Sequence, residues 1–145
     1  MTIPYLVHQF LEQSAQRRPD QPFLIHEGVA TRYGEVEAGA NRLARVLRGG
    51  GLARGDRVGL LAQNSRFYVE SYYGILKAGG IAVPLNTAES GYTLAKSLSG
   101  CGARMLIAGP RFGKATEQFI EAGTPLDLLA VPSQKQLPEL VTPIR

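Results

Sequence analysis

Hydrophobic residues recur at helical spacing in several segments of the chain. Along residues 34–48, apolar side chains fall every three or four positions, and Gly49-Gly50-Gly51 follows this stripe. A stripe with that period buries one face of a helix, and glycine commonly ends a helix. The pattern therefore predicts a helix over 34–48. The same reasoning predicts further helices over residues 5–17, 66–78, 90–99 and 112–122, with Asn64-Ser65 capping the third of the five.

Short hydrophobic runs bounded by turn residues lie between these helices. They occupy residues 57–62, 81–85, 104–108 and 126–131. Runs of this length are typical of strands buried in a parallel sheet. Because strands and helices alternate from residue 57 onward, the pattern predicts right-handed βαβ crossovers. The predicted fold class is therefore α/β, with a parallel sheet that carries helices on both faces.

The two ends of the chain follow other patterns. Residues 23–26 and 29–33 are extended runs joined by a turn at Glu27-Gly28, which predicts a β-hairpin after the N-terminal helix. From Pro132 the composition shifts to proline and polar residues without an apolar period. We therefore predict one α/β subdomain over residues 1–131 and a linker-like tail over 132–145.

Composition and charge narrow the classes of function. The chain has 145 residues, of which 44% are hydrophobic and 19% charged, as expected for one globular domain with a core. Its net charge of +4 permits nucleic-acid binding. However, Arg42, Arg45 and Arg48, joined by Arg54 and Arg57, have no aromatic residues between them to stack bases. A row of this kind is typical of a solvated helix face, so no nucleic-acid partner is predicted.

The single cysteine, Cys101, bears on the compartment. One cysteine forms no intramolecular disulfide and no thiolate metal site, which favours a reducing cytoplasm. No window approaches the run of about 18 apolar residues that a membrane-spanning helix needs. The first residues also lack a basic leader before an apolar core. These features predict a cytoplasmic protein without a membrane span.

Two glycine-rich segments are candidates for binding phosphate. The segment at 49–55 follows a predicted helix, and its glycines miss the G-x-G-x-x-G spacing of a dinucleotide site. The segment at 109–114 is better placed, between a strand and a helix. It has three residues between its glycines where a P-loop has four, and Ala115 stands in place of Ser or Thr. Both segments are predicted to be turns, with Lys114 solvated.

The titratable residues form no catalytic or metal-binding pattern. His8 and His26 lie on separate predicted elements, without a carboxylate or cysteine at ligand or triad spacing. Glu35 opens a helix and Asp56 occupies a turn, where an acidic residue has a structural role. No catalytic, cofactor-binding or metal-binding residue is therefore assigned.

One longer motif resembles a known family. Residues 76–86 read LKAGGIAVPLN and resemble the LKAGxxxVPLN motif of adenylate-forming enzymes, the superfamily of AMP-forming acyl-CoA synthetases, adenylation domains and luciferases. Further segments stand in the family's order: TRYGEV at 31–36 resembles T-Y-x-E-L, GDRV at 55–58 with QNS at 63–65 resembles GDRV…PNS, and SGCGAR at 99–104 is similar to D-S-G-A-K. The resemblance covers about residues 5–131.

This resemblance implies the N-terminal subdomain of the adenylate-forming fold and an ATP-dependent reaction. In that family a carboxylate attacks the α-phosphate of Mg-ATP, and a thiol such as CoA then displaces AMP. The family's Ser/Thr/Gly-rich phosphate loop, its Y-G-x-T-E-like segment, its ribose-binding aspartate and its C-terminal lysine have no counterpart here. The chain alone is therefore expected to be inactive and to bind no ATP, Mg²⁺ or CoA. Its expected partners are the remaining part of the enzyme and, there, a carboxylate substrate.

The resemblance also bears on the type of ligase. Leu85-Asn86 favours an acyl-CoA synthetase of fatty acid metabolism, because peptide-synthetase adenylation domains more often have aspartate at the matching place. Thr87 departs from the proline that often follows, and Gly59 stands where a larger or alanine side chain is usual. A peptide-synthetase fragment stays open as an alternative. So do a stand-alone, non-catalytic binding module that keeps the fold and a flavodoxin-like nucleotide binder.

Overall fold

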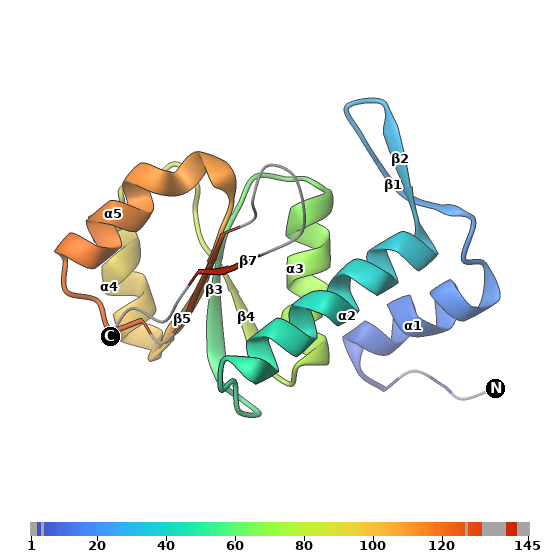
Figure 1. Ribbon diagram of the computed structural model, residues 1–145, viewed down its shortest axis with the longest axis horizontal. Helices are drawn as coiled ribbons and strands as arrows, with labels where there is room; N and C mark the ends of the chain where they lie inside the picture. The colour runs from blue at the N-terminus through green and yellow to red at the C-terminus, as the bar shows by residue number, and fades with distance from the viewer. Residues whose placement is uncertain (1–2, 4, 127, 132–138, 142–145) are drawn as a thin grey trace.

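A computed structural model describes residues 3, 5–126, 128–131 and 139–141 of the chain. The elements follow one another in this order: α1 (Val7–Arg17), β1 (Pro22–His26), β2 (Val29–Arg32), α2 (Tyr33–Gly49), β3 (Arg57–Leu61), α3 (Arg66–Lys77), β4 (Ile81–Pro84), α4 (Gly91–Cys101), β5 (Met105–Ala108), the 3-10 helix η1 (Pro110–Phe112), α5 (Gly113–Glu121), β6 (Leu128–Val131) and β7 (Glu139–Val141) (Figure 1). All five predicted helices, the hairpin and the four predicted sheet strands are present, with ends shifted by a few residues.

The main sheet has the strand order β4-β3-β5-β6-β7. The strands from β4 to β6 run parallel, and Val58 of β3 lies opposite Ala82 on one side and Met105 on the other. The parallel α/β sheet is thereby confirmed. β7 pairs antiparallel with β6 and lies within the stretch predicted as a tail, a strand that the composition does not predict. Residues 132–138 and 142–145 of that stretch lie outside the described residues.

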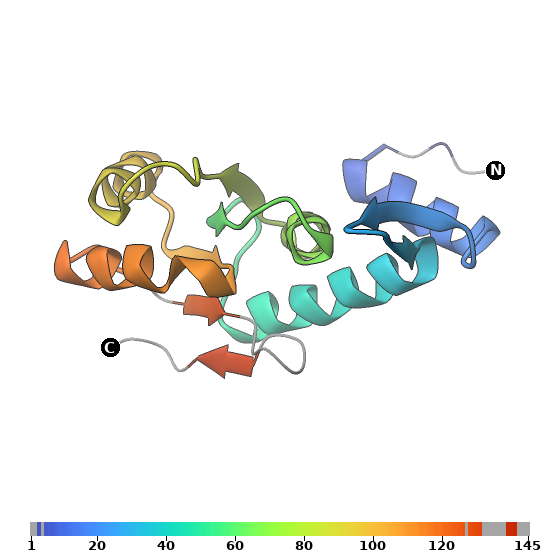
Figure 2. The same ribbon diagram turned by 90° about the horizontal axis from the view of Figure 1, so that it is seen from above.

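Alternate side chains of β3 and β5 supply two hydrophobic clusters. Val58, Leu60, Met105 and Ile107 pack with α2 and α3 on one face of the sheet. On the other face, Leu61, Leu106 and Ala108 pack with α4 and α5. Figure 2 shows the two helix pairs on opposite sides of the strands. The period of two along a strand thus gives each face its own core, as the predicted layers require.

Helices α2 and α3 approach each other closely through glycines. A Cβ atom on Gly39 would lie 2.2 Å from Cδ of Glu70, and one on Gly74 would lie 2.9 Å from Cβ of Leu43. On the outer side of this pair, α1 and the hairpin pack around buried Leu11 and Val36 (Figure 1). The amino-terminal elements therefore extend the α2–α3 layer and do not join the main sheet.

Helices α2 to α5 all end in the same way. A glycine with positive φ follows each one, namely Gly51, Gly79, Gly102 and Gly123. The N–H of the next residue then donates to a carbonyl five residues earlier, as from Gly80 to Ile75 at 2.9 Å. This is the Schellman arrangement, in which a left-handed residue lets the last turn of a helix satisfy its carbonyls. The glycine cluster after α2 is therefore a helix stop, as predicted.

None of the helices in the described part of the chain is both long enough and apolar enough to cross a bilayer.

Candidate functional site

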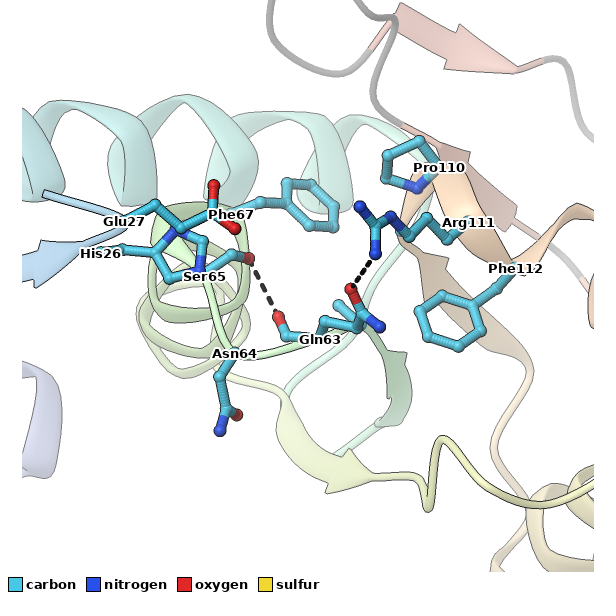
Figure 3. A pocket seen from close by; sticks show the side chains of 11 residues that line it. His26, Glu27, Gln63, Asn64, Ser65, Phe67, Pro110, Arg111 and Phe112 are labelled. Atoms are coloured by element: carbon cyan, nitrogen blue, oxygen red, sulfur yellow. Dashed lines mark hydrogen bonds between the residues drawn. The ribbon is translucent and has the colours of Figure 1, made fainter. Parts of the chain in front are cut away.

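A cavity of about 470 Å³ opens at the carboxyl ends of β3 and β5. Three separate segments of the chain line it: the hairpin turn at His26 and Glu27, residues 62–67 without Arg66, and residues 109–112 (Figure 3). The sequence offers residues 109–114 as a candidate segment, but no local pattern joins it to the other two segments, which lie far from it along the chain.

The topology explains why a cavity forms at this place. After β3 the chain runs through α3, on one face of the sheet, to β4. After β5 it runs through α5, on the opposite face, to β6. The two connections therefore diverge between β3 and β5 and leave a crevice at their carboxyl ends. Such a switch point is where open α/β sheets bind ligands.

The β3–α3 segment is held by the cap of α3. The hydroxyl of Ser65 accepts a hydrogen bond from the N–H of Tyr68 at 3.2 Å and donates to the carbonyl oxygen of Gln63 at 2.9 Å. The predicted capping role of this segment is thereby confirmed at Ser65. These two bonds fix the backbone beneath Gln63 and Asn64, whose exposed side chains line the cavity.

The β5–α5 segment forms the opposite wall. The N–H of Gly109 donates to the carbonyl of Leu61 at 2.8 Å, which keeps this segment against the end of β3. Nη1 of Arg111 then donates to Oε1 of Gln63 at 3.2 Å and joins the two walls. Figure 3 shows these two side chains pointing toward each other, with Phe112 beside them.

Charged and apolar groups share the lining. Among the described lining residues, Arg111 is the only Lys or Arg and Glu27 the only carboxylate. Phe67 and Phe112 supply apolar surface, and each also packs against one of the two core clusters. Helices α3 and α5 both begin at this edge with no acidic residue in the first turn, so their positive ends are not neutralised locally. The arrangement suits binding of an anionic ligand that has an apolar part.

The residues singled out from the sequence occupy separate places in the structure. The carboxylate of Glu35 accepts from the N–H of Arg32 at 2.8 Å, and that of Asp56 accepts from the N–H of Ala53 at 2.8 Å, so both structural roles are confirmed. Lys114 is exposed, as predicted. His26 lines the cavity, whereas His8 lies on α1, and the structure does not bring them together.

The prediction of a solvated face holds for Arg45, Arg48, Arg54 and Arg57, which are all exposed, and is wrong for Arg42. Arg42 is half-buried because α3 packs across α2, and its charge acts on Glu70. Nε of Arg57 donates to the carbonyl oxygen of Cys101 at 2.7 Å and joins the start of β3 to the end of α4. Arg45 and Arg48 are exposed, although Arg48 also donates to the carbonyl of Lys77.

Two buried charges on α3 also escape sequence reasoning. Lys77, 8% exposed, pairs with Glu12 of α1 at 2.5 Å and with Glu37 of α2 at 2.8 Å. Glu70 is buried, and this burial raises the pKa of its carboxyl, although a 2.6 Å hydrogen bond from Arg66 opposes the shift. In the sequence, the only indication that either side chain is buried is its place within an apolar helical stripe. Lys77 joins α3 to α1 and α2, whereas Glu70 pairs with Arg66 of its own helix, and neither lines the cavity.

Acidic, histidine and cysteine side chains are dispersed over the described part of the chain. Nowhere among these residues do three of them gather as a metal ion would require.

Comparison with known proteins matches the chain to one family over most of its length. The family described as AMP-binding enzyme matches residues 11–142, which confirms the resemblance carried by the motifs. Surfactin synthase subunit 1 of Bacillus subtilis (strain 168) is 39% identical over 101 residues, 70% of this chain and 3% of that protein. The fatty acid–[acyl-carrier-protein] ligase ScoC of Streptomyces coeruleorubidus is 33% identical over 105 residues, 72% of this chain and 20% of that protein. The chain thus spans a fifth or less of these two relatives.

A solved structure agrees with the fold. The crystal structure of the anthranilate CoA ligase AuaEII in complex with anthranoyl-AMP superposes with a TM-score of 0.82 at 29% identity. The match covers 90% of this chain and 25% of that one. The predicted fold, the N-terminal subdomain of the adenylate-forming fold, is thereby confirmed.

Proposed function

Since the chain belongs to the AMP-binding enzyme family, we propose that it is the N-terminal part of an ATP-dependent ligase that activates a carboxylic acid. In the proposed reaction a carboxylate oxygen attacks the α-phosphorus of Mg-ATP and pyrophosphate leaves. A thiolate then attacks the acyl carbon of the adenylate, and AMP leaves as the thioester forms. The observation that carries the proposal is the family match over residues 11–142, within which the family motifs stand in order.

The contribution of these residues to such a ligase is a scaffold. The LKAGGIAVPLN motif spans the end of α3, the left-handed turn at Gly79 and strand β4, and it contributes no residue to the cavity lining. Phosphoryl chemistry depends on positioned charges around the phosphate groups. The family segments that supply those charges have no counterpart in this sequence. The chain alone is therefore proposed to be inactive, with ATP, Mg²⁺ and CoA acting in the longer protein.

We favour an acyl-CoA synthetase in the cytoplasm, acting in fatty acid metabolism. Leu85-Asn86 supports this choice, and so does the likeness to a fatty acid ligase and to a CoA ligase. A peptide-synthetase-type adenylation domain is the second candidate. The 39% identity with a surfactin synthase subunit favours it.

Pyrophosphate exchange into ATP tests the proposal. We expect no exchange by residues 1–145 alone, and exchange by the longer protein read from the same gene when a fatty or aromatic acid is present. An amino acid as the preferred substrate would favour the second candidate, and mass spectrometry of the products with CoA identifies the acceptor. Exchange by the 145-residue chain, or a natural stop codon after the codon for Arg145, would contradict the proposal.

A further inference from the structure

Exposed hydrophobic side chains gather at the first helix. Among the residues that the structure describes, ten large hydrophobic side chains are exposed, and five of them lie within residues 3–10: Ile3, Tyr5, Leu6, Val7 and Phe10. Single exposed hydrophobic residues are normal on a protein surface, whereas a contiguous group marks a surface that binds something apolar. The start of α1 is therefore a candidate interaction surface.

Helix α1 has two apolar sides. Leu11 and Ala15 are buried on one side, where Leu11 packs in the cluster shared with α2 and α3. Leu6, Val7 and Phe10 are three and four residues apart, so they project together from another side of the helix. These three residues form what we call the α1 stripe. Packing among the described residues uses the first side and leaves the α1 stripe exposed.

The start of α1 is held in helical form. Oε1 of Gln9 accepts hydrogen bonds from the N–H of Tyr5 at 2.7 Å and from the N–H of Leu6 at 2.9 Å. N–H groups at this position have no partner within the helix, so the Gln9 side chain supplies the missing acceptor. The α1 stripe is therefore presented by a preformed helix, and binding through it requires little further ordering.

The exposed side of α1 also carries positive charge. Arg17 follows Phe10 by seven residues, which is two helical turns, so it lies on the same side as the α1 stripe, and Arg18 follows it. Both arginines are exposed. The one acidic residue of α1, Glu12, lies on a different side, where it pairs with Lys77 of α3. The exposed side therefore combines apolar side chains with cations and has no carboxylate.

The shape of this surface indicates what it fits. Figures 1 and 2 show α1 at the edge of the molecule, with α2 on its inner side. The α1 stripe lies on the outside of a helix and lines none of the cavities described above. A convex apolar stripe with cations at one end matches a broad surface that is apolar inside and negatively charged outside. The boundary between acyl chains and anionic headgroups in a bilayer has this chemistry, and amphipathic helices with Lys or Arg lie in it.

We propose that α1 binds the surface of an anionic phospholipid bilayer. Leu6, Val7 and Phe10 enter the acyl region, and Arg17 and Arg18 contact the phosphate groups. A helix that lies along a bilayer does not need the length of one that crosses it. The proposal goes beyond the proposed function, which assigns no partner to α1. Vesicle binding requires neither ATP nor an acid, so its outcome is separate from that of pyrophosphate exchange.

Sedimentation of the 145-residue chain with vesicles of phosphatidylglycerol and phosphatidylcholine tests the apolar part. Phe10→Ser should weaken binding about tenfold, because a large apolar side chain no longer enters the acyl region. Phe10→Leu keeps an apolar side chain and should weaken binding only about twofold. Ile120→Ser on α5 is the matched control, since Ile120 is 50% exposed and Phe10 58%. It should leave binding unchanged. Circular dichroism checks that all three variants are folded.

A change in lipid charge tests the cationic part. Arg17→Gln should weaken binding to the anionic vesicles about fivefold, because each cation near the surface adds attraction to the headgroups. It should leave the weaker binding to pure phosphatidylcholine vesicles unchanged. Arg54→Gln is the control, because Arg54 is exposed in the turn before β3, away from α1. Equal losses in Arg17→Gln and Arg54→Gln would show attraction by net charge and contradict the placement of Arg17 at the headgroups.

Two other occupants of the α1 stripe give different results. If the 145-residue chain binds vesicles and the longer protein read from the same gene does not, the rest of that protein covers the stripe and the proposal is overturned. If the chain dimerises in lipid-free buffer and Phe10→Ser abolishes the dimer, the occupant is a second copy, which also overturns it. The same holds if the chain does not bind at about 1 mM accessible lipid, or if Phe10→Ser and Ile120→Ser weaken binding equally.

Discussion

The two edges of the parallel sheet differ in how the chain passes between helix and strand. At the amino edge, each described connection from a helix back to a strand contains a glycine with positive φ: Gly51 and Gly55, Gly79, Gly102 and Gly123. At the carboxyl edge, the described connections from strand to helix, over residues 62–65, 85–90 and 109–112, contain no positive φ. Two of these connections, 62–65 and 109–112, instead bring polar and aromatic side chains to the cavity.

The difference teaches how to interpret glycine in this chain. Glycine-rich segments invite the hypothesis of a phosphate loop, yet most positive-φ glycines here end helices. The cavity forms at the other edge, where helices begin and the connections expose side chains. In this chain most glycines with positive φ therefore indicate helix ends, whereas the polar and aromatic side chains at the strand ends indicate the site.

The largest effect is expected from a carboxyl-edge glycine that is needed for close packing. A Cβ on Gly91 would lie 2.3 Å from the carbonyl oxygen of Ala115, so Gly91→Ala must push α4 and α5 apart. We expect a loss of about 3 kcal/mol in the free energy of unfolding, measured by urea denaturation.

Gly100, on the same helix, is the matched control. No atom lies within 4 Å of the place that an alanine methyl group would take there, so Gly100→Ala should be stabilising by about 0.5 kcal/mol. Equal effects of the two substitutions would show that α4 and α5 are not in close contact.

The next effect concerns the amino-edge end of α3. Lys77→Met removes the cation between Glu12 and Glu37, which are 35% and 20% exposed. We expect a loss of about 2 kcal/mol, less than for a fully buried pair because water reaches both carboxylates. Thermal unfolding measures it, with Lys96→Met on the exposed side of α4 as control. No difference between the two variants would contradict the role of Lys77 in joining α1, α2 and α3.

A smaller effect tests the helix stops themselves. Gly79 has φ +91° and no atom closer than 3.7 Å to a Cβ, so Gly79→Ala meets conformational strain without a clash. We expect a loss of about 1 to 2 kcal/mol in urea denaturation. Gly49→Ala, also in open space but without positive φ, should cost nothing. If Gly79→Ala is as stable as wild type, the left-handed turn is not required there.

The smallest effect is a pH dependence at Glu70, in the half of α3 nearer the carboxyl edge. Burial raises the pKa of this carboxyl above its ordinary value of 4.5, so the folded state holds its proton more tightly than the unfolded state. The contribution of Glu70 to stability is therefore greatest below that value and falls as the pH rises through the folded-state pKa.

Glu70→Gln removes this dependence while Arg66 can still donate to the amide oxygen. We expect the variant to be at least as stable as wild type at pH 7, and the difference to shrink or reverse at pH 4. Urea denaturation at the two pH values measures it. If the free energy of unfolding changes by the same amount between pH 4 and pH 7 in wild type and in the variant, Glu70 is not the cause of the pH dependence.

Local patterns predicted much of this fold. The helix over 34–48, the short apolar strands and the hairpin turn at Glu27-Gly28 depend on side-chain period and turn residues that are adjacent in the chain. The roles of Ser65, Glu35 and Asp56 were also predictable, because each bonds to backbone within three residues. The family followed from ordered motifs, and the match over residues 11–142 agrees with them.

The features that the sequence did not predict depend on residues that are far apart in the chain. The bond from Arg111 to Gln63 joins residues 48 positions apart, and that from Lys77 to Glu12 joins residues 65 apart. The burial of Arg42 depends on which helix crosses α2, which no local pattern reveals. Strand β7 is short and follows a proline-containing stretch, so pairing with β6 supplies what its own sequence does not indicate.

The sequence by itself thus determined the order and type of the main elements from α1 to β6, the helix stops and the family, because these depend on period, turn chemistry and motifs within a few residues. Only the tertiary structure decided the strand order, the buried charges of α3 and the cavity at the switch point. The reason is physical: packing both faces of the sheet brings the ends of β3 and β5 together, and only then do Gln63, Phe67 and Arg111 share one space.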